Sequence, residues 1–122
     1  MSFRHVQRLR KSEAFAACYR SGRVAKNGLV VVHARPNDEA ATSVGFAVSK
    51  KLGKAVSRNK VKRRLRESVR DVSRRIGPGF DVVISARMRA KDAPYAQLAG
   101  AVVGALSRAG VLRPEEQKGG TS

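Results

Sequence analysis

The sequence is poor in the residues that build disulfides, metal sites and nucleotide-binding loops. It has one cysteine, Cys18, and two histidines, His5 and His33, and neither histidine has a neighbouring set of ligands. An internal disulfide and a cysteine-rich zinc site are therefore excluded. The glycines match neither a P-loop nor a dinucleotide-binding fingerprint. We expect the protein itself to hold no metal and no nucleotide cofactor.

Acidic residues are also scarce. The chain has nine Asp and Glu, and they are scattered: Asp38 and Glu39 lie in a predicted turn, whereas Asp81 and Asp92 stand alone. Metal-assisted phosphodiester hydrolysis needs clustered carboxylates to hold Mg²⁺. No Ser-His-Asp or Cys-His set suggests itself either. The sequence thus indicates a binding protein with no catalytic residues of its own.

Long apolar segments are absent as well. The longest runs, Leu29–Val32 and Ala101–Leu106, are far shorter than the roughly 20 residues that cross a bilayer. Basic residues interrupt the first dozen positions and no apolar stretch follows them, so the sequence predicts no secretory signal. We expect a cytoplasmic protein without a membrane partner.

Positive charge is what the chain has in excess. Twenty-six Lys and Arg against nine Asp and Glu leave a formal net charge of +17 on 122 residues. That length suits one domain with one modest core. A surface that repels itself this strongly is usually neutralised by a partner, and nucleic acid is the usual partner for such a charge balance.

Much of this charge falls in residues 49–75, which are predicted to form a basic loop followed by a basic amphipathic helix. At about 100° per residue, one face of the helix is apolar and the opposite face is cationic. Ser57 is the predicted N-cap, and Gly77-Pro78-Gly79 ends the helix. The apolar face holds Val61, Leu65, Val69, Val72 and Ile76, and the cationic face holds Asn59, Lys62, Arg63, Arg66 and Arg70.

A cationic helix face has two explanations. Most charged faces are merely solvated, but such faces mix both signs at i,i+4 spacing. This helix carries Glu67 and Asp71 against nine basic residues between Arg58 and Arg75. Its first turns are basic too, at the end where the helix dipole disfavours positive charge. Binding of a polyanion is the better explanation.

Aromatic residues are few, but two of them share one face of a predicted first helix that begins near Ser12 and ends at Ser21-Gly22. Phe15 and Tyr19 have i,i+4 spacing. Rings at this spacing most often pack into the core. The alternative is a surface on which unpaired bases stack, and the residues alone leave both interpretations open.

The remaining elements complete a small α+β domain. Strands are predicted at residues 23–25, 29–35, 42–49 and 80–86, and a last helix begins at Pro94 and ends before Gly110. The strand after the basic helix is expected to be a parallel neighbour of the strand before it, in a βαβ crossover. The predicted order is α-β-β-β-α-β-α, with a mixed four-stranded sheet and helices packed on it.

The same pattern divides the chain into three parts. Residues 1–11 are predicted to be a basic N-terminal arm, residues 12–112 the α+β domain, and residues 113–122 a polar flexible tail.

The basic segment resembles a known family signature. Residues 58–67, Arg-Asn-Lys-Val-Lys-Arg-Arg-Leu-Arg-Glu, preceded by Val48-Ser49-Lys50-Lys51 and Gly53, are very similar to the RNR signature of the protein component of bacterial ribonuclease P. The resemblance extends to Arg8-Leu9, to Phe15 and Tyr19, to the strand that contains Asp81-Val-Val-Ile, and to the order of elements. It covers roughly residues 7 to 110.

The resemblance implies the small subunit of a ribonucleoprotein endoribonuclease that removes the 5′ leader from precursor tRNA. In this family the RNA subunit holds the catalytic Mg²⁺ and performs the chemistry. The protein alone is therefore not expected to cleave RNA, and no obligate protein partner is expected. The α+β domain becomes an RNA-binding domain, and its βαβ crossover is implied to have the uncommon left hand.

The resemblance also implies roles for two sets of residues. Family members often carry an aromatic residue where His33 falls, and an imidazole stacks less strongly than a larger ring. The set implied to bind the catalytic RNA is Lys50, Lys51, Arg58, Asn59, Lys60, Lys62, Arg63, Arg66 and Arg70. The set implied to line a cleft for the single-stranded leader, between the first helix and the sheet, is Phe15, Tyr19, Val31 and His33.

Two other functions compete with this one. A ribosomal or other structural RNA-binding protein of this size and charge needs phosphate contacts alone, whereas a leader cleft also needs stacking surfaces. A membrane-active basic protein would bind vesicles without RNA, which fits poorly with a chain that builds a sheet.

Overall fold

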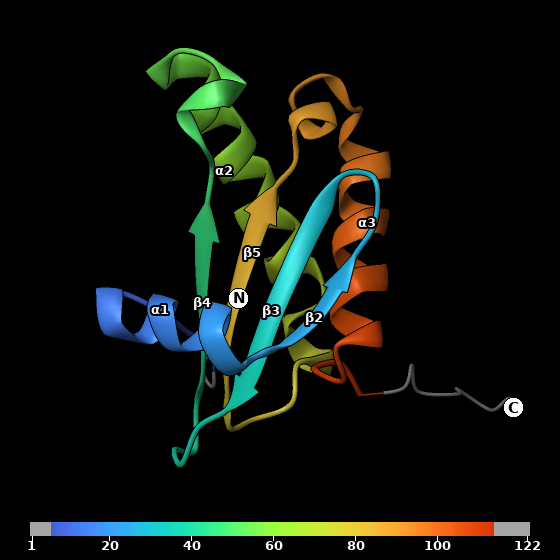
Figure 1. Cartoon of the computed structure of the whole chain (residues 1–122). Coiled ribbons are helices and arrows are strands. Elements are labelled where there is room, and N and C mark those ends of the chain that lie inside the picture. The colour runs from blue at the N-terminus through green and yellow to red at the C-terminus, as the bar shows by residue number, and fades with distance from the viewer. Residues whose placement is uncertain (1–5, 114–122) are drawn as a thin grey trace, which may run out of the picture.

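The computed structural model describes residues 6–113 (Figure 1). Over these residues the strands are β1 (Val6–Arg8), β2 (Arg23–Lys26), β3 (Val30–Pro36), β4 (Thr42–Ala47) and β5 (Phe80–Ala86). The α-helices are α1 (Ser12–Ser21), α2 (Ala55–Asp71) and α3 (Tyr95–Arg108). Short 3-10 turns lie between them: η1 (Lys50–Leu52), η2 (Ser73–Arg75) and η3 (Met88–Asp92).

The strands form one mixed sheet in the order β1-β4-β5-β3-β2. β5 lies in the middle, parallel to β4 and antiparallel to β3, and β2 is antiparallel to β3 at one edge. The α+β class and the parallel pairing of the strands on either side of the basic helix are both confirmed.

The sheet has five strands where four were predicted. Val6–Arg8, which the sequence analysis placed in a basic arm, pairs in parallel with Thr42–Val44 as β1, and Leu9 is buried. One apolar residue followed by Gln and Arg carries too little period-two signal to predict a strand. Residues 1–5 of the predicted arm and residues 114–122 of the predicted tail lie outside the described residues.

Helices cover both faces of the sheet unequally. α2 and α3 pack on one face and α1 crosses the other, as Figure 1 shows. Along β3, Val30, Val32 and Ala34 are buried toward α2 and α3, so the alternate residues face α1. A large core lies under α2 and α3, and a smaller cluster of Leu9, Cys18 and Val83 lies under α1.

The crossover from β4 through α2 to β5 is left-handed. In Figure 1 both strands point upward, α2 descends behind the sheet, and β5 lies to the right of β4. A chain that moves to the right while passing behind the sheet turns in the left-handed sense, against the strong general preference. The structure thus has the hand that the family resemblance implied.

The ends of α2 differ from the prediction. Its N-cap is Lys54, which makes no side-chain capping bond, and Ser57 lies inside the first turn. The helix ends at Asp71 and the chain continues through η2. The apolar face is as predicted, because Val61, Leu65, Val69 and Ile76 are buried and Val72 is half-buried against the same core.

Hydrogen bonds fix both ends of α3. Gly110 has a φ of 81°, the Val111 N–H donates to the Leu106 carbonyl at 3.0 Å, and the Gly110 N–H donates to the Ser107 carbonyl at 3.0 Å. This is the Schellman arrangement that favours glycine after a helix. At the other end the Tyr95 hydroxyl donates to Asp71 Oδ2 of α2 at 2.9 Å. Burial and that bond raise the pKa of Tyr95 to about 12.

Candidate RNA-binding surfaces

The outer side of α2 and the preceding turn η1 form a surface that we call the basic face. None of the nine residues implied to bind the catalytic RNA is buried. Arg58 is half-exposed because its Nε donates to the Gly53 carbonyl at 3.1 Å, which holds the turn before α2. The basic face comprises Lys50, Lys51, Arg58, Asn59, Lys62, Arg63, Arg66 and Arg70.

Lys60 does not share that side of α2. It precedes Arg64 by one turn, so the two project in the same direction. Arg64 points toward η3, where its guanidinium donates to the Ala93 carbonyl at 3.1 Å. Lys60 therefore lies on the η3 side of the helix, and Arg64 ties α2 to the segment that precedes α3.

Carboxylates of residues 6–113 do not neutralise the middle of the basic face. Within residues 6–113 the one ion pair is between Arg35 and Asp81, at 3.8 Å, on β3 and β5. The side chains of Lys62, Arg63 and Arg66 make no hydrogen bond or ion pair with any described residue. Their charge is available to an anionic partner.

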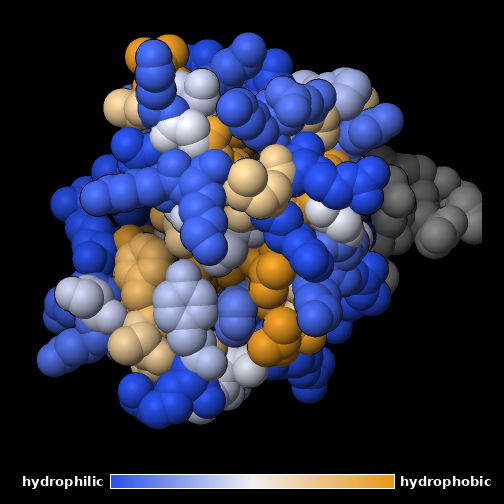
Figure 2. All heavy atoms as spheres, turned by 45° about the horizontal axis from the view of Figure 1, so that its top comes forward, coloured by the Kyte–Doolittle hydropathy of each residue, from blue (hydrophilic) through white to orange (hydrophobic). Residues whose placement is uncertain are grey.

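Cations near η3 extend this charge, and the sequence analysis did not assign them. Arg87, Arg89 and Lys91 are exposed, and η3 packs against η1. Figure 2 brings this end of the molecule forward and shows hydrophilic side chains over most of it. Because β4 and β5 are parallel, the turns that follow them meet at the same edge of the sheet. That pairing is the signal that could have placed η3 beside η1.

The opposite face of the sheet carries the four residues implied to bind the leader. Tyr19 is 47% exposed on α1. Its ring meets the His33 ring edge to face, with centroids 4.9 Å apart and planes at 82°. Val31 is half-buried two residues before His33 on β3 and so faces the same side. The structure therefore brings Tyr19, Val31 and His33 together at one side of α1.

Phe15 has a different environment from Tyr19, although both project from one face of α1. Phe15 is half-buried and packs against the cluster under α1. Its ring lies directly on Gly45 of β4, so closely that a Cβ added at Gly45 would fall 2.4 Å from Phe15 Cζ. Phe15 is thus an anchor of α1 on the sheet, and Tyr19 is the exposed ring.

His33 is held in its uncharged form. Its Nδ1 atom is buried and has no hydrogen-bond partner among the described residues. Burial lowers the pKa of His33 below its usual value, because the charged imidazolium loses more solvation than the neutral ring. A neutral imidazole beside Tyr19 offers a stacking surface without added charge.

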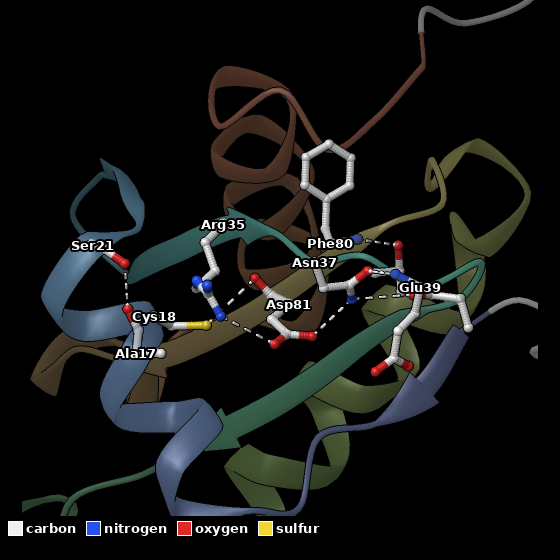
Figure 3. Close-up of polar contacts among 10 residues, drawn as sticks. Ala17, Cys18, Ser21, Arg35, Asn37, Glu39, Phe80 and Asp81 are labelled. Carbon is white, nitrogen blue, oxygen red and sulfur yellow. Dashed lines mark hydrogen bonds and ion pairs between the residues drawn. The ribbon is translucent and has the colours of Figure 1, made fainter.

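A polar network fixes α1 on the sheet (Figure 3). The Cys18 thiol donates to the Asp81 carbonyl at 3.5 Å, and Asn37 Nδ2 donates to Asp81 Oδ1 at 2.9 Å, beside the Arg35 ion pair. Burial and, to a lesser degree, the Asp81 carboxylate raise the pKa of Cys18, with Arg35 opposing. Cys18 is therefore a buried thiol that positions α1.

No group of three or more His, Cys, Asp and Glu residues within residues 6–113 could hold a metal ion. No helix in the same range is long and apolar enough to cross a membrane.

A domain that leaves Lys62, Arg63 and Arg66 of one helix without carboxylate partners, and that exposes a ring on the far face of its sheet, belongs to the class of small RNA-binding proteins. The chain itself belongs to the ribonuclease P protein family, because the family model described as Ribonuclease P matches residues 3–110. It is therefore a protein subunit of ribonuclease P, which acts with an RNA subunit in tRNA processing.

Individual relatives agree with this assignment. The chain is 43% identical over 109 residues to the ribonuclease P protein component of Symbiobacterium thermophilum, covering 88% of this chain and 95% of the relative. It is 47% identical to that of Streptomyces avermitilis, covering 83% and 89%.

Solved structures show the same fold. The Staphylococcus aureus RNase P protein superposes with a TM-score of 0.80 at 34% identity, covering 87% of this chain and 97% of the other. The RNase P protein from Thermotoga maritima gives a TM-score of 0.77 at 30% identity, covering 84% and 96%.

Proposed function

We propose that this subunit binds two RNAs through two surfaces. The basic face binds the catalytic RNA, and the cleft between α1 and the sheet binds the single-stranded 5′ leader of precursor tRNA. The exposure of Tyr19 beside His33, on the face opposite α2, is the observation that carries this division. A protein that recognised folded RNA through phosphates alone would need no exposed ring there.

The chemistry of each surface suits its proposed RNA. Unpaired Lys and Arg side chains on a rigid helix bind the closely spaced phosphates of a folded RNA and release its counterions. Exposed aromatic rings stack on unpaired bases with little preference for sequence. Leaders of different precursor tRNAs differ in sequence, so stacking is the appropriate mode of recognition.

The catalytic step belongs to the RNA subunit in this proposal. The described residues hold no carboxylate cluster for Mg²⁺, and two-metal phosphodiester hydrolysis depends on such ligands. The protein instead binds the leader beside the catalytic RNA and so increases the affinity for precursor tRNA over mature tRNA. We place this activity in the cytoplasm, where bacterial precursor tRNA is made.

Reconstitution tests the proposal. The pure protein is added to a ribonuclease P RNA at a Mg²⁺ concentration too low for the RNA alone, and 5′ maturation of a precursor tRNA is measured. We expect the protein to restore maturation, and the protein freed of RNA to cleave nothing. Failure to stimulate the RNA, or Mg²⁺-dependent cleavage by the RNA-free protein, would contradict the proposal.

A further inference from the structure

β1 covers only part of the edge of β4. The pairing ends with Arg8 opposite Val44, and the Leu9 N–H donates to the Val44 carbonyl at 3.0 Å. From Gly45 onward no strand lies beside β4 on this side among the described residues. The uncovered edge lies between α1 on one face of the sheet and α2 on the other.

Two adjoining hollows lie along β4, the first beside the part that β1 covers and the second at the uncovered edge. The first, a slot of about 180 Å³, is lined mainly by apolar side chains of β1, β4 and α2, with two arginines. The second, of about 370 Å³, shares Arg8, Phe46 and Arg66 with the slot and extends to Lys62 and Phe15. The slot is formed chiefly by Val6, Val44, Phe46, Val69, Arg8 and Arg66.

The slot has apolar walls and two cationic side chains, and one kind of chemical group suits both. Its walls are apolar and include the half-buried Phe46 ring, so they favour a flat apolar occupant. The side chains of Arg8 and Arg66 make no hydrogen bond or ion pair with any described residue, so they favour an anion. The volume of the slot equals that of about six water molecules in the liquid, which is comparable to the volume of one nucleobase. A nucleotide supplies both the flat ring and the charge.

We propose that this slot holds one unstacked base of the catalytic RNA, against Phe46, while Arg8 and Arg66 bind the adjacent phosphates. The proposal rests on the proposed binding of that RNA to the basic face, of which Arg66 is part. The base enters beside the open edge of β4, where no backbone strand blocks it. Because the second hollow continues to Phe15, this nucleotide would lie next to the leader cleft and would join the two RNA-binding surfaces.

The test separates base packing from charge. Phe46→Leu removes the ring but keeps an apolar side chain, and Arg66→Lys keeps the charge but loses the planar guanidinium. Phe80→Leu, at a half-buried phenylalanine of β5, and Arg108→Lys, on α3, are the matched controls. Affinity for a ribonuclease P RNA is measured over a range of salt concentrations. Thermal melting followed by circular dichroism checks that each variant folds.

We expect Phe46→Leu and Arg66→Lys each to weaken binding by about tenfold without a change in salt slope, because no charge is lost. The controls should stay within about twofold of the wild type. If the two variants bound ribonuclease P RNA as tightly as their controls, the proposal that the slot holds a base would be overturned.

Crosslinking provides a readout that does not depend on folding of a variant. The wild-type protein is irradiated with ribonuclease P RNA containing 4-thiouridine, and crosslinked peptides are identified by mass spectrometry. A nucleotide attached within residues 42–47 is expected. Crosslinks confined to exposed residues of α2 would overturn the proposal that the slot holds a base, while the proposed binding of the RNA to the basic face would stand. Absence of any binding by the wild type would instead overturn the proposed function.

Discussion

Phe15 and Tyr19 show how two residues with one sequence pattern come to differ. Both project from the same face of α1, but Phe15 rests on Gly45, which has no side chain, whereas Tyr19 meets His33 at the open side of the helix. The i,i+4 spacing predicted the shared face. It could not predict which ring is covered, because that depends on which strand residue lies beneath each ring.

Tyr19→Ala tests the leader cleft at its exposed ring. We expect about tenfold weaker binding of a precursor tRNA with a 5′ leader by the holoenzyme, because one base–aromatic stack is typically worth about 1–3 kcal/mol. Binding of mature tRNA and of the catalytic RNA should hardly change. Tyr19→Phe, which keeps the ring, is the control. Equal losses for precursor and mature tRNA would assign Tyr19 to the fold instead.

His33 gives the stability of the protein a pH dependence of defined sign. Burial lowers its pKa in the folded state, so below about pH 6.5 the unfolded chain binds more protons than the folded one. The free energy of unfolding should therefore fall as the pH drops through about 6.5, and level off below the folded-state pKa.

Denaturant unfolding of the wild type and of His33→Gln between about pH 5 and pH 8 measures this effect. The free energy of unfolding of the variant should not fall in this way at acidic pH. Because His5 is present in both proteins, its contribution cancels in the comparison. Stability curves that stay parallel over the whole range would show that His33 titrates alike in both states.

At the scale of elements, features that depend on one segment alone were predicted correctly, whereas features that depend on contacts between distant segments were not. The apolar face of α2, β5 from Phe80 to Ala86 and the Gly110 cap followed from spacing and capping rules. The strand β1 forms only because it pairs with the distant residues Thr42–Val44. The contact of η3 with η1 likewise depends on a distant segment, because η1 follows the C-terminal end of β4. Ser57 has the side chain of an N-cap, but the helix begins earlier, after Lys54, whose side chain makes no capping bond and so gives no sequence signal.

The seating of α1 depends on the absence of a side chain at Gly45. Gly45→Ala would place a methyl group 2.4 Å from the Phe15 ring, so α1 must shift. Overpacking of this kind typically costs about 1–3 kcal/mol. We expect a comparable loss in the free energy of unfolding, together with weaker binding of the leader.

Ala47→Gly, on the same face of β4, is the comparison for Gly45→Ala because it adds no atoms. Calorimetry or chemical unfolding gives the stability, and leader-bearing tRNA gives the binding. Unchanged stability in Gly45→Ala would mean that the close contact relaxes without cost.

The middle of α2 should act as an array of phosphate contacts. Arg63→Ala and Arg66→Ala should each reduce the magnitude of the salt slope of binding to ribonuclease P RNA by somewhat under one unit, since each lost contact releases fewer counterions. Arg108→Ala, on α3, removes the same charge away from α2 and should leave the slope nearly unchanged. If both α2 variants kept the wild-type affinity and slope, the basic face would be only solvated.

At the scale of the whole molecule, the chain has a net charge of +17, and residues 6–113 contain a single ion pair. Self-repulsion of this size destabilises a compact state, and anions that bind the folded chain oppose it. The free protein should therefore be markedly more stable in sulfate than in sodium chloride of equal ionic strength.

We expect sulfate to raise the melting temperature by at least about 4 °C over sodium chloride at matched ionic strength, which corresponds to roughly 1 kcal/mol. Melting followed by circular dichroism measures the difference. Identical melting temperatures in the two salts would mean that general screening suffices and that the folded chain has no preferred anion sites.

The open edge of β4 is also a place where a second copy of the chain could pair. An uncovered strand offers its backbone to any other strand, which is a common start of aggregation, and natural sheets often guard such edges with charge. Arg8, Lys62 and Arg66 stand around this edge, so a second copy that approached would meet its own charges. The same cations that we propose to bind RNA therefore also guard this edge, and we expect a variant without them to associate through β4 before it unfolds.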